Sequence, residues 1–140
     1  MANGLYALFK QNLGAKLVNM TVDDIRPVLS RSALYTVNLS THQFLSDVPS
    51  SARIAMLGAA LASPTFSLGV FATSNFVWTA VPSGPSADQV ILTDYNGNGA
   101  AADTARMLIS FMDTGITGMP VTPNGGNINV TVNASGWFAL

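Results

Sequence analysis

The chain has 140 residues, a length typical of a single domain, and contains no cysteine. Charged residues make up 9% of it, with 6 Lys+Arg, 7 Asp+Glu and 1 His, against roughly a quarter in ordinary soluble domains. This composition excludes disulfides, disfavours an enzyme because catalytic groups come mainly from the scarce residue types, and with a net charge of -1 disfavours nucleic-acid binding.

The N-terminal residues predict a short amphipathic helix over 3–14, with Gly14 as its stop. Its apolar stripe consists of Leu5, Leu8, Phe9 and Leu13. Residues 1–15 either cap the end of a sheet core or form an arm that packs on a neighbouring subunit. Residues 1–10 lack a basic region followed by a long apolar stretch, so we expect no signal peptide here.

The next segments have the patterns of strands. Residues 25–29 are apolar, but Pro27 removes a ladder donor, which predicts a sheet edge or bend. Residues 35–39 alternate cleanly between apolar and polar side chains, as a half-buried strand does.

Residues 41–48 predict one or two helical turns, with Thr41 as N-cap and Pro49 after them. A strand is expected over 53–57. Residues 54–87 carry no charge, but polar residues and prolines interrupt them, so we expect strands there and no membrane span.

Further strands are expected over 65–71, 76–81, 89–95 and 105–112, the last two paired around a loop. The clearest alternation lies in 127–133 and places its aliphatic side chains on one face. These are Ile128, Val130 and Val132.

Short strands separated by turn signals predict a mainly β fold, an antiparallel β-sandwich or jelly-roll-like barrel with a short N-terminal helix. We expect one domain over 1–140, with residues 134–140 as an apolar C-terminal tail.

The best metal candidate is Asp94–Gly99, which matches the first half of a calcium loop. The twelfth position, normally a bidentate Glu, is Ala105, and Asp103 is out of register. A hairpin loop built on Asn-Gly explains the segment better. The sequence therefore predicts no metal and no cofactor.

Other candidate sites are equally weak. Asp23 and Asp24 are adjacent and would diverge on a strand, and His42 has no evident triad partners. Exposed Trp78 or Trp137 could form a shelf for a glycan, although aromatic residues in alternating strands are more often core. We expect no catalytic residues.

Three segments carry a resemblance to a known family: residues 1–13, 35–45 and 117–128, the last followed by an alternating strand and an apolar C-terminus. In this order they resemble small virion structural proteins of tailed bacteriophages. The first strand of that family is a clean aliphatic run, whereas this chain has Arg26 and Pro27 there. The family offers no catalytic residues to carry over.

The resemblance implies a capsid decoration (cement) protein on the virion surface that binds the major capsid protein, with no nucleic-acid or membrane partner. Self-association into a dimer or trimer is also expected. The alternatives are a neck, tail or fibre component of the same virion, and a β-sandwich glycan-binding module. The expected interface residues are Leu5, Leu8, Phe9, Leu13, Trp137, Phe138 and Leu140.

Overall fold

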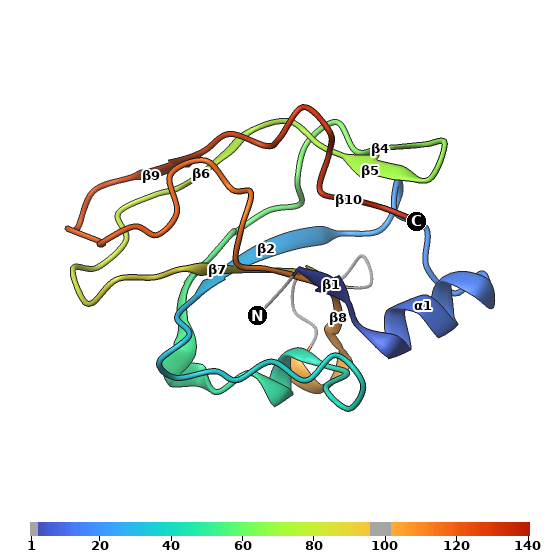
Figure 1. The fold of residues 1–140 in the computed structure, drawn as a ribbon, viewed down its shortest axis with the longest axis horizontal. Coiled ribbons are helices and arrows are strands. Elements are labelled where there is room, and N and C mark those ends of the chain that lie inside the picture. The colour runs from blue at the N-terminus through green and yellow to red at the C-terminus, as the bar shows by residue number, and fades with distance from the viewer. Residues whose placement is uncertain (1–2, 96–101) are drawn as a thin grey trace.

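The computed structural model describes residues 3–95 and 102–140, in which antiparallel strands form two layers (Figure 1). One layer is a five-stranded sheet in the order β1-β8-β7-β2-β3, here called the central sheet. Its strands are β1 (Gly4–Leu5), β2 (Ile25–Ser30), β3 (Arg53–Met56), β7 (Gln89–Asp94) and β8 (Met107–Met112).

The second layer contains two smaller sheets, β10-β5-β4 and β6-β9. Their strands are β4 (Thr65–Ser67), β5 (Val70–Ala72), β6 (Phe76–Trp78), β9 (Ile128–Val130) and β10 (Phe138–Ala139). Besides α1 (Ala7–Gly14), three short 3-10 turns occur in the described residues: η1 (Leu45–Asp47), η2 (Ser50–Ala52) and η3 (Asp103–Ala105). The fold is thus mainly β, with antiparallel sheets and one short N-terminal helix, as the sequence predicts and consistent with a β-sandwich.

Both faces of the central sheet are buried, and alternate side chains serve two separate cores. Val90 and Leu92 point into the core shared with the small sheets, whereas Ile91 points into a second core. The second core is closed by residues 31–52, which run along the far side of the central sheet in Figure 1. This explains why β7 and β8 read as nearly continuous apolar runs.

Several predicted elements are confirmed. Strands β7 and β8 pair antiparallel, with Ile91 opposite Phe111. Ile128 and Val130 are buried while Asn129 is exposed. The alternation of apolar and polar residues over 127–133 therefore correctly predicts which face of this strand is buried. The helix ends at Gly14 as predicted. No helix among the described residues has the length and apolar content that crossing a membrane requires.

The prediction for the start of the chain needs a correction. Helix α1 begins at Ala7, because Gly4 and Leu5 are extended and pair with Phe111 and Ser110 of β8. The N-terminal segment is therefore both an edge strand and a helix.

Pro27 does not lie on an edge strand. Strand β2 pairs with β7 along its whole length and with β3 from Val28 onward, so it is an interior strand. Pro27 lies opposite Leu92 and one residue before the β2–β3 pairing begins. A residue without a backbone donor is tolerated there because the second ladder has not yet started.

Two predicted strands have other structures. Residues 65–71 form the β4–β5 hairpin, whose two-residue turn places Leu68 and Gly69 at φ +50° and +82°. Residues 35–39 alternate in burial as predicted but pair with no strand among the described residues, because they cover the central sheet.

The helical turn expected over 41–48 is shorter than predicted. It is the single 3-10 turn η1, and it follows Phe44, so Thr41 is not its N-cap. The strand expected over 76–81 likewise ends at Trp78, before Ala80 adopts φ +49°.

Candidate functional site

The predicted interface residues of the N-terminal segment contribute to the core of this chain. Phe9 is fully buried, and its ring lies edge-to-face on Phe138 at 5.8 Å between centroids. Leu5, Leu8 and Leu13 are half-buried against the same core. The helix therefore covers one end of the two-layer structure, and a contact from it to a neighbouring subunit stays a prediction.

The C-terminal tail is also held in place. The Trp137 backbone N–H donates to the Phe71 carbonyl at 2.7 Å, and its indole Nε1–H donates to Thr73 Oγ1 at 2.9 Å. The Leu140 N–H donates to the Gly69 carbonyl at 2.9 Å. Trp137 is buried and Phe138 half-buried, so Leu140, with 61% of its surface exposed, is the most accessible of the predicted interface residues.

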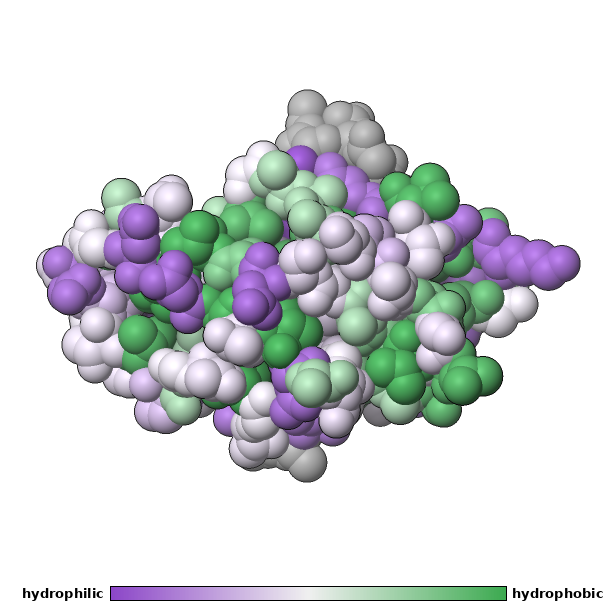
Figure 2. Space-filling model, turned by 90° about the horizontal axis from the view of Figure 1, so that it is seen from above, coloured by the Kyte–Doolittle hydropathy of each residue, from purple (hydrophilic) through white to green (hydrophobic). Residues whose placement is uncertain are grey.

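The structure places exposed apolar side chains at one end of the molecule. That end carries α1, the β4–β5 hairpin and the C-terminus in Figure 1, and Figure 2 shows hydrophobic surface there. We call the exposed Leu68 and Leu140 the apolar end surface; the Leu140 N–H to Gly69 carbonyl hydrogen bond places them together. Sequence reasoning singled out Leu140 alone, because Leu68-Gly69 lacks the Asn-Gly pattern that marks a two-residue turn.

An open groove lies beside this surface, with a volume of about 390 Å³. Leu13 at the end of α1, Met20 in the following loop and Phe66 of β4 line it. Lys16 is the charged residue on its rim. The groove is therefore a hollow of mixed polarity with one charged residue on its rim.

A cluster of charged residues packs around Tyr95 at the end of β7. The guanidinium groups of Arg26 and Arg106 lie 4.4 Å and 4.0 Å from the centroid of its ring. Arg26 pairs with Asp24 at 2.8 Å, and burial raises the pKa of Tyr95 although both arginines oppose this. These charges hold the sheet end together.

Asp103 belongs to the same cluster. Its carboxylate accepts from Arg53 at 2.6 Å and from Arg106 at 3.1 Å, so two guanidinium groups occupy it. The calcium-loop candidate at Asp94–Gly99 falls largely on residues 96–101, outside the described residues. Within 3–95 and 102–140, no group of three or more His, Asp or Glu side chains is placed to hold a metal ion.

His42 lies at the end of a hydrogen-bonded chain. The Tyr6 and Tyr35 hydroxyls are 2.9 Å apart, and the Tyr35 hydroxyl is 2.9 Å from His42 Nδ1. The Asn38 N–H also donates to Nδ1, at 3.2 Å. This arrangement fastens the segment 35–42 to the second core, and it contains no serine or carboxylate in the positions of a triad.

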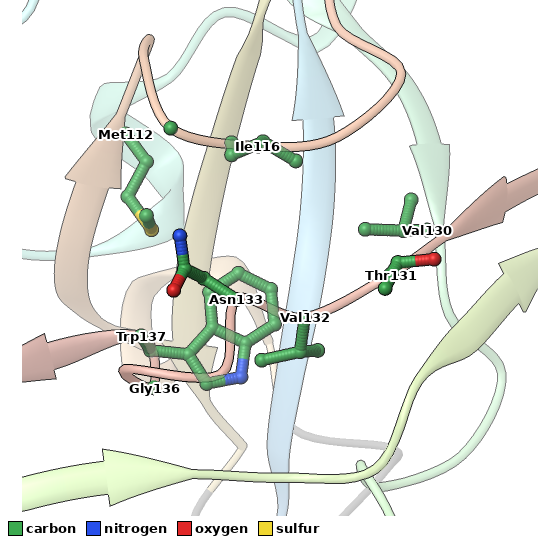
Figure 3. A pocket seen from close by; sticks show the side chains of 9 residues that line it. Met112, Ile116, Val130, Thr131, Val132, Asn133, Gly136 and Trp137 are labelled. Carbon is green, nitrogen blue, oxygen red and sulfur yellow. The ribbon is translucent and has the colours of Figure 1, made fainter.

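Neither tryptophan offers a face to a glycan, because Trp78 and Trp137 are 2% and 5% exposed. The favoured interpretation, that both tryptophans belong to the core, is confirmed, and the alternative of an exposed shelf is wrong. Beside Trp137 lies a small cavity of about 10 Å³, where Met112 and Asn133 converge with the indole (Figure 3). Such a space holds about one water molecule and no organic ligand.

No protein-family model matches the sequence, and no curated protein matches it either. The resemblance to phage virion proteins accordingly rests on the three segments quoted above.

Proposed function

We propose that this protein is a non-enzymatic structural component of a tailed-phage virion that decorates the capsid and stabilises it by binding the major capsid protein. The observation that carries the proposal is the scarcity of charge on the surface combined with the apolar end surface. The resemblance of the three sequence segments supports the virion assignment, and the mainly β fold suits a rigid surface component.

The folded state makes the surface even poorer in charge than the composition suggests. Asp24 pairs with Arg26, and Asp103 pairs with both Arg53 and Arg106. Asp94 is also buried, at 2% exposure. Because so few charges face solvent, contact with another protein requires little desolvation of ions, whereas a free monomer would lack the usual electrostatic protection against association.

Many weak contacts are sufficient for such a role. A capsid presents its binding sites in a repeated array, so a self-associated decoration protein binds several of them at once and gains avidity without strong individual contacts. We propose a dimer or trimer on this ground. Leu140 and the rest of the apolar end surface are the contacts we assign to the shell.

The decisive measurement is quantitative mass spectrometry of purified virions, reported as copies of this chain per copy of the major capsid protein. A ratio near unity, or a simple fraction of it, supports decoration of the whole shell. A trace ratio assigns the protein to the neck, tail or fibre, and absence from the particle refutes a virion role.

A second experiment tests the stabilising role. Particles assembled without the protein are expected to release their genome at lower temperature and after milder osmotic shock than complete particles. Adding the purified protein back should restore both values. Unchanged thermal and osmotic stability would refute cementing.

A further inference from the structure

The N-terminal segment is joined to the rest of the protein by a short exposed connection. We call residues 3–14 the arm, residues 15–17 the hinge and the rest of the chain the body. The arm contains β1 and α1, and α1 lies at one end of the molecule in Figure 1. All hinge residues are exposed, and the chain becomes buried again at Val18. A change of the hinge's backbone angles therefore disturbs no core packing.

The arm closes both cores of the body. Tyr6 and Phe9 are fully buried, Tyr6 in the second core and Phe9 in the core between the two layers. Asn3 holds the turn that follows β8, where its Oδ1 accepts from the Asp113 N–H at 2.8 Å. Withdrawal of the arm exposes apolar surface at both cores to water. A body without its own arm is consequently a binding site for an arm.

The structure shows what fits this site on the body. The occupant is the segment 3–14, and a second copy of the chain carries the identical segment. An arm from a second copy makes the same ladder with β8 and the same buried contacts of Tyr6 and Phe9, because these contacts involve no hinge residue. The closed and the exchanged forms thus differ in the hinge and in the surface that two copies bury between them.

The hinge is strained in the closed form. The helix ends in a reversal in which Lys16 adopts a left-handed φ of +61°. The Lys16 and Leu17 N–H groups donate there to the Leu13 and Asn12 carbonyls. Glycine is the usual residue in this conformation because a side chain makes it costly, yet Gly14 lies two residues earlier, where φ is not positive. Straightening the hinge relieves this strain, and strained short hinges favour exchange between copies.

Leu17 adds to the stability of the exchanged form. Its side chain is 67% exposed in the closed chain. Three hinge residues span at most about 11 Å when extended, so two copies that exchange arms must have their bodies in contact near the hinges. In a symmetric dimer the two hinges lie close to the two-fold axis, where both Leu17 side chains are removed from water.

We propose that two copies of this chain exchange arms, so that the arm of each copy pairs with β8 of the other and closes its two cores. The inference rests on the self-association included in the proposed function and gives that association a structural form. A short hinge holds the arm at an effective concentration of order millimolar for its own body. Exchange is therefore favoured where copies are crowded, in concentrated solution or on a repeated array.

Thiol pairing in the purified full-length protein tests the exchange, because the natural chain has no cysteine. Leu5 and Ser110 lie opposite each other in the β1–β8 ladder, within the reach of a disulfide. Leu5→Cys and Ser110→Cys chains, distinguished by a mass tag, are refolded together at high concentration and oxidised. A disulfide between positions 5 and 110 of different chains forms only where the arm of one chain lies on β8 of another.

Two controls accompany this pair of variants. Leu5→Cys mixed with Thr36→Cys, at an exposed threonine outside the ladder, measures disulfides that form by random collision. The double variant Leu5→Cys/Ser110→Cys should oxidise within one chain at low concentration, which shows that the two thiols can meet. If it does not oxidise, the effect of the hinge variants on the dimer fraction decides the test alone.

The hinge variants are matched at one position. Lys16→Gly removes the strain of the closed form, whereas Lys16→Ala removes the same charge and keeps the strain. We expect Lys16→Gly to lower the fraction of dimer, measured by light scattering, and the yield of the disulfide between chains by about tenfold. Lys16→Ala should behave like the wild type.

The possible results separate the exchange from the self-association. A disulfide between chains above the Thr36→Cys control, lowered by Lys16→Gly, supports the exchange. A dimer that forms no such disulfide and ignores Lys16→Gly associates through another surface, so the inference fails and the self-association stands. A protein that stays monomeric at every concentration overturns both, and the virion assignment is then still decided by the copy number in particles.

Discussion

At the scale of single residues, the chain of hydrogen bonds from Tyr6 through Tyr35 to His42 has a defined order of donors and acceptors. The Asn38 N–H can only donate, so His42 Nδ1 acts as an acceptor. The Tyr35 hydroxyl consequently donates to Nδ1, and the Tyr6 hydroxyl donates to Tyr35. Burial, reinforced by the neighbouring Tyr35, raises the pKa of Tyr6 far above its ordinary value, and burial also raises the pKa of Tyr35.

This direction predicts unequal effects for two conservative variants. Tyr6→Phe removes one hydrogen bond but leaves Tyr35 donating to His42, which should cost about 1 kcal/mol. Tyr35→Phe leaves the buried Tyr6 hydroxyl without its acceptor and should cost about 1–3 kcal/mol. Urea unfolding at pH 7 measures both values, and a larger loss for Tyr6→Phe would show that the chain runs the other way.

Asp47 predicts a pH dependence of stability. Burial opposes its ionisation, but the N–H groups of Gln43 and Phe44, aided by His42, lower its pKa below the ordinary value. Its contribution to stability is thus fully present above the unfolded-state pKa of about 3.9 and is lost as the pH falls through the lower folded-state value.

Asp47→Asn should therefore destabilise the protein at pH 7, by less than about 1 kcal/mol because the side chain is exposed. The difference from wild type should shrink when unfolding is measured near pH 3. An equal difference at both pH values would mean that the charge of Asp47 plays no part.

At the scale of elements, the periodicity of apolar residues predicted which residues are buried better than it predicted which segments pair as strands. Residues 35–39 alternate because Tyr35 and Val37 enter the second core, yet their backbone joins no ladder among the described residues. The sequence pattern predicted one strand over residues 65–71, where the structure has β4 and β5. The reason is that the turn residues Leu68 and Gly69 lack the usual Asn-Gly signal. The sequence could not predict that β2, despite Pro27, lies in the interior of the sheet, since this depends on the residue at which the β2–β3 pairing starts.

Gly136 is the element-scale position with the sharpest prediction. It has φ +83°, and a Cβ there would lie 2.5 Å from the Phe71 carbonyl oxygen, in the pairing that holds the tail. Gly136→Ala should cost about 2–4 kcal/mol, from backbone strain and overlap together. Gly115, at φ +75° with nothing near its Cβ position, is the matched control, and Gly115→Ala should cost roughly 1 kcal/mol. If thermal unfolding shows equal losses of stability for the two variants, the predicted overlap of the Gly136→Ala methyl group with Phe71 is contradicted.

At the scale of the whole molecule, the scarcity of surface charge predicts attachment that depends little on salt. Raising the salt from about 0.1 M to about 1 M shortens the Debye length from roughly 10 Å to 3 Å, which weakens ionic contacts but not apolar or backbone ones. Sedimentation of the protein with capsid particles should show less than about a threefold change in affinity over this range. A steep decrease would indicate binding through the exposed lysines and aspartates.

The candidate site was less predictable than the fold. The predicted interface residues are mostly those with strong apolar character, and that character places Phe9 and Trp137 in the core of this chain. A groove lined by residues 54–58 and 77–82 has no sequence signal, because its geometry depends on two sheets meeting. The exposed Leu17 and Val22 are visible only once the loop after α1 is placed.

The strand order of the central sheet has a consequence for biosynthesis. Strand β1 pairs with β8, and β2 pairs with β7 as well as with the nearer β3, so the β1–β8 and β2–β7 ladders wait for partners made much later on the ribosome. At roughly 5–20 residues per second, several seconds pass before these two ladders can form. The central sheet therefore closes only after Met112 has emerged, and we expect folding at the slow rates of proteins rich in long-range contacts.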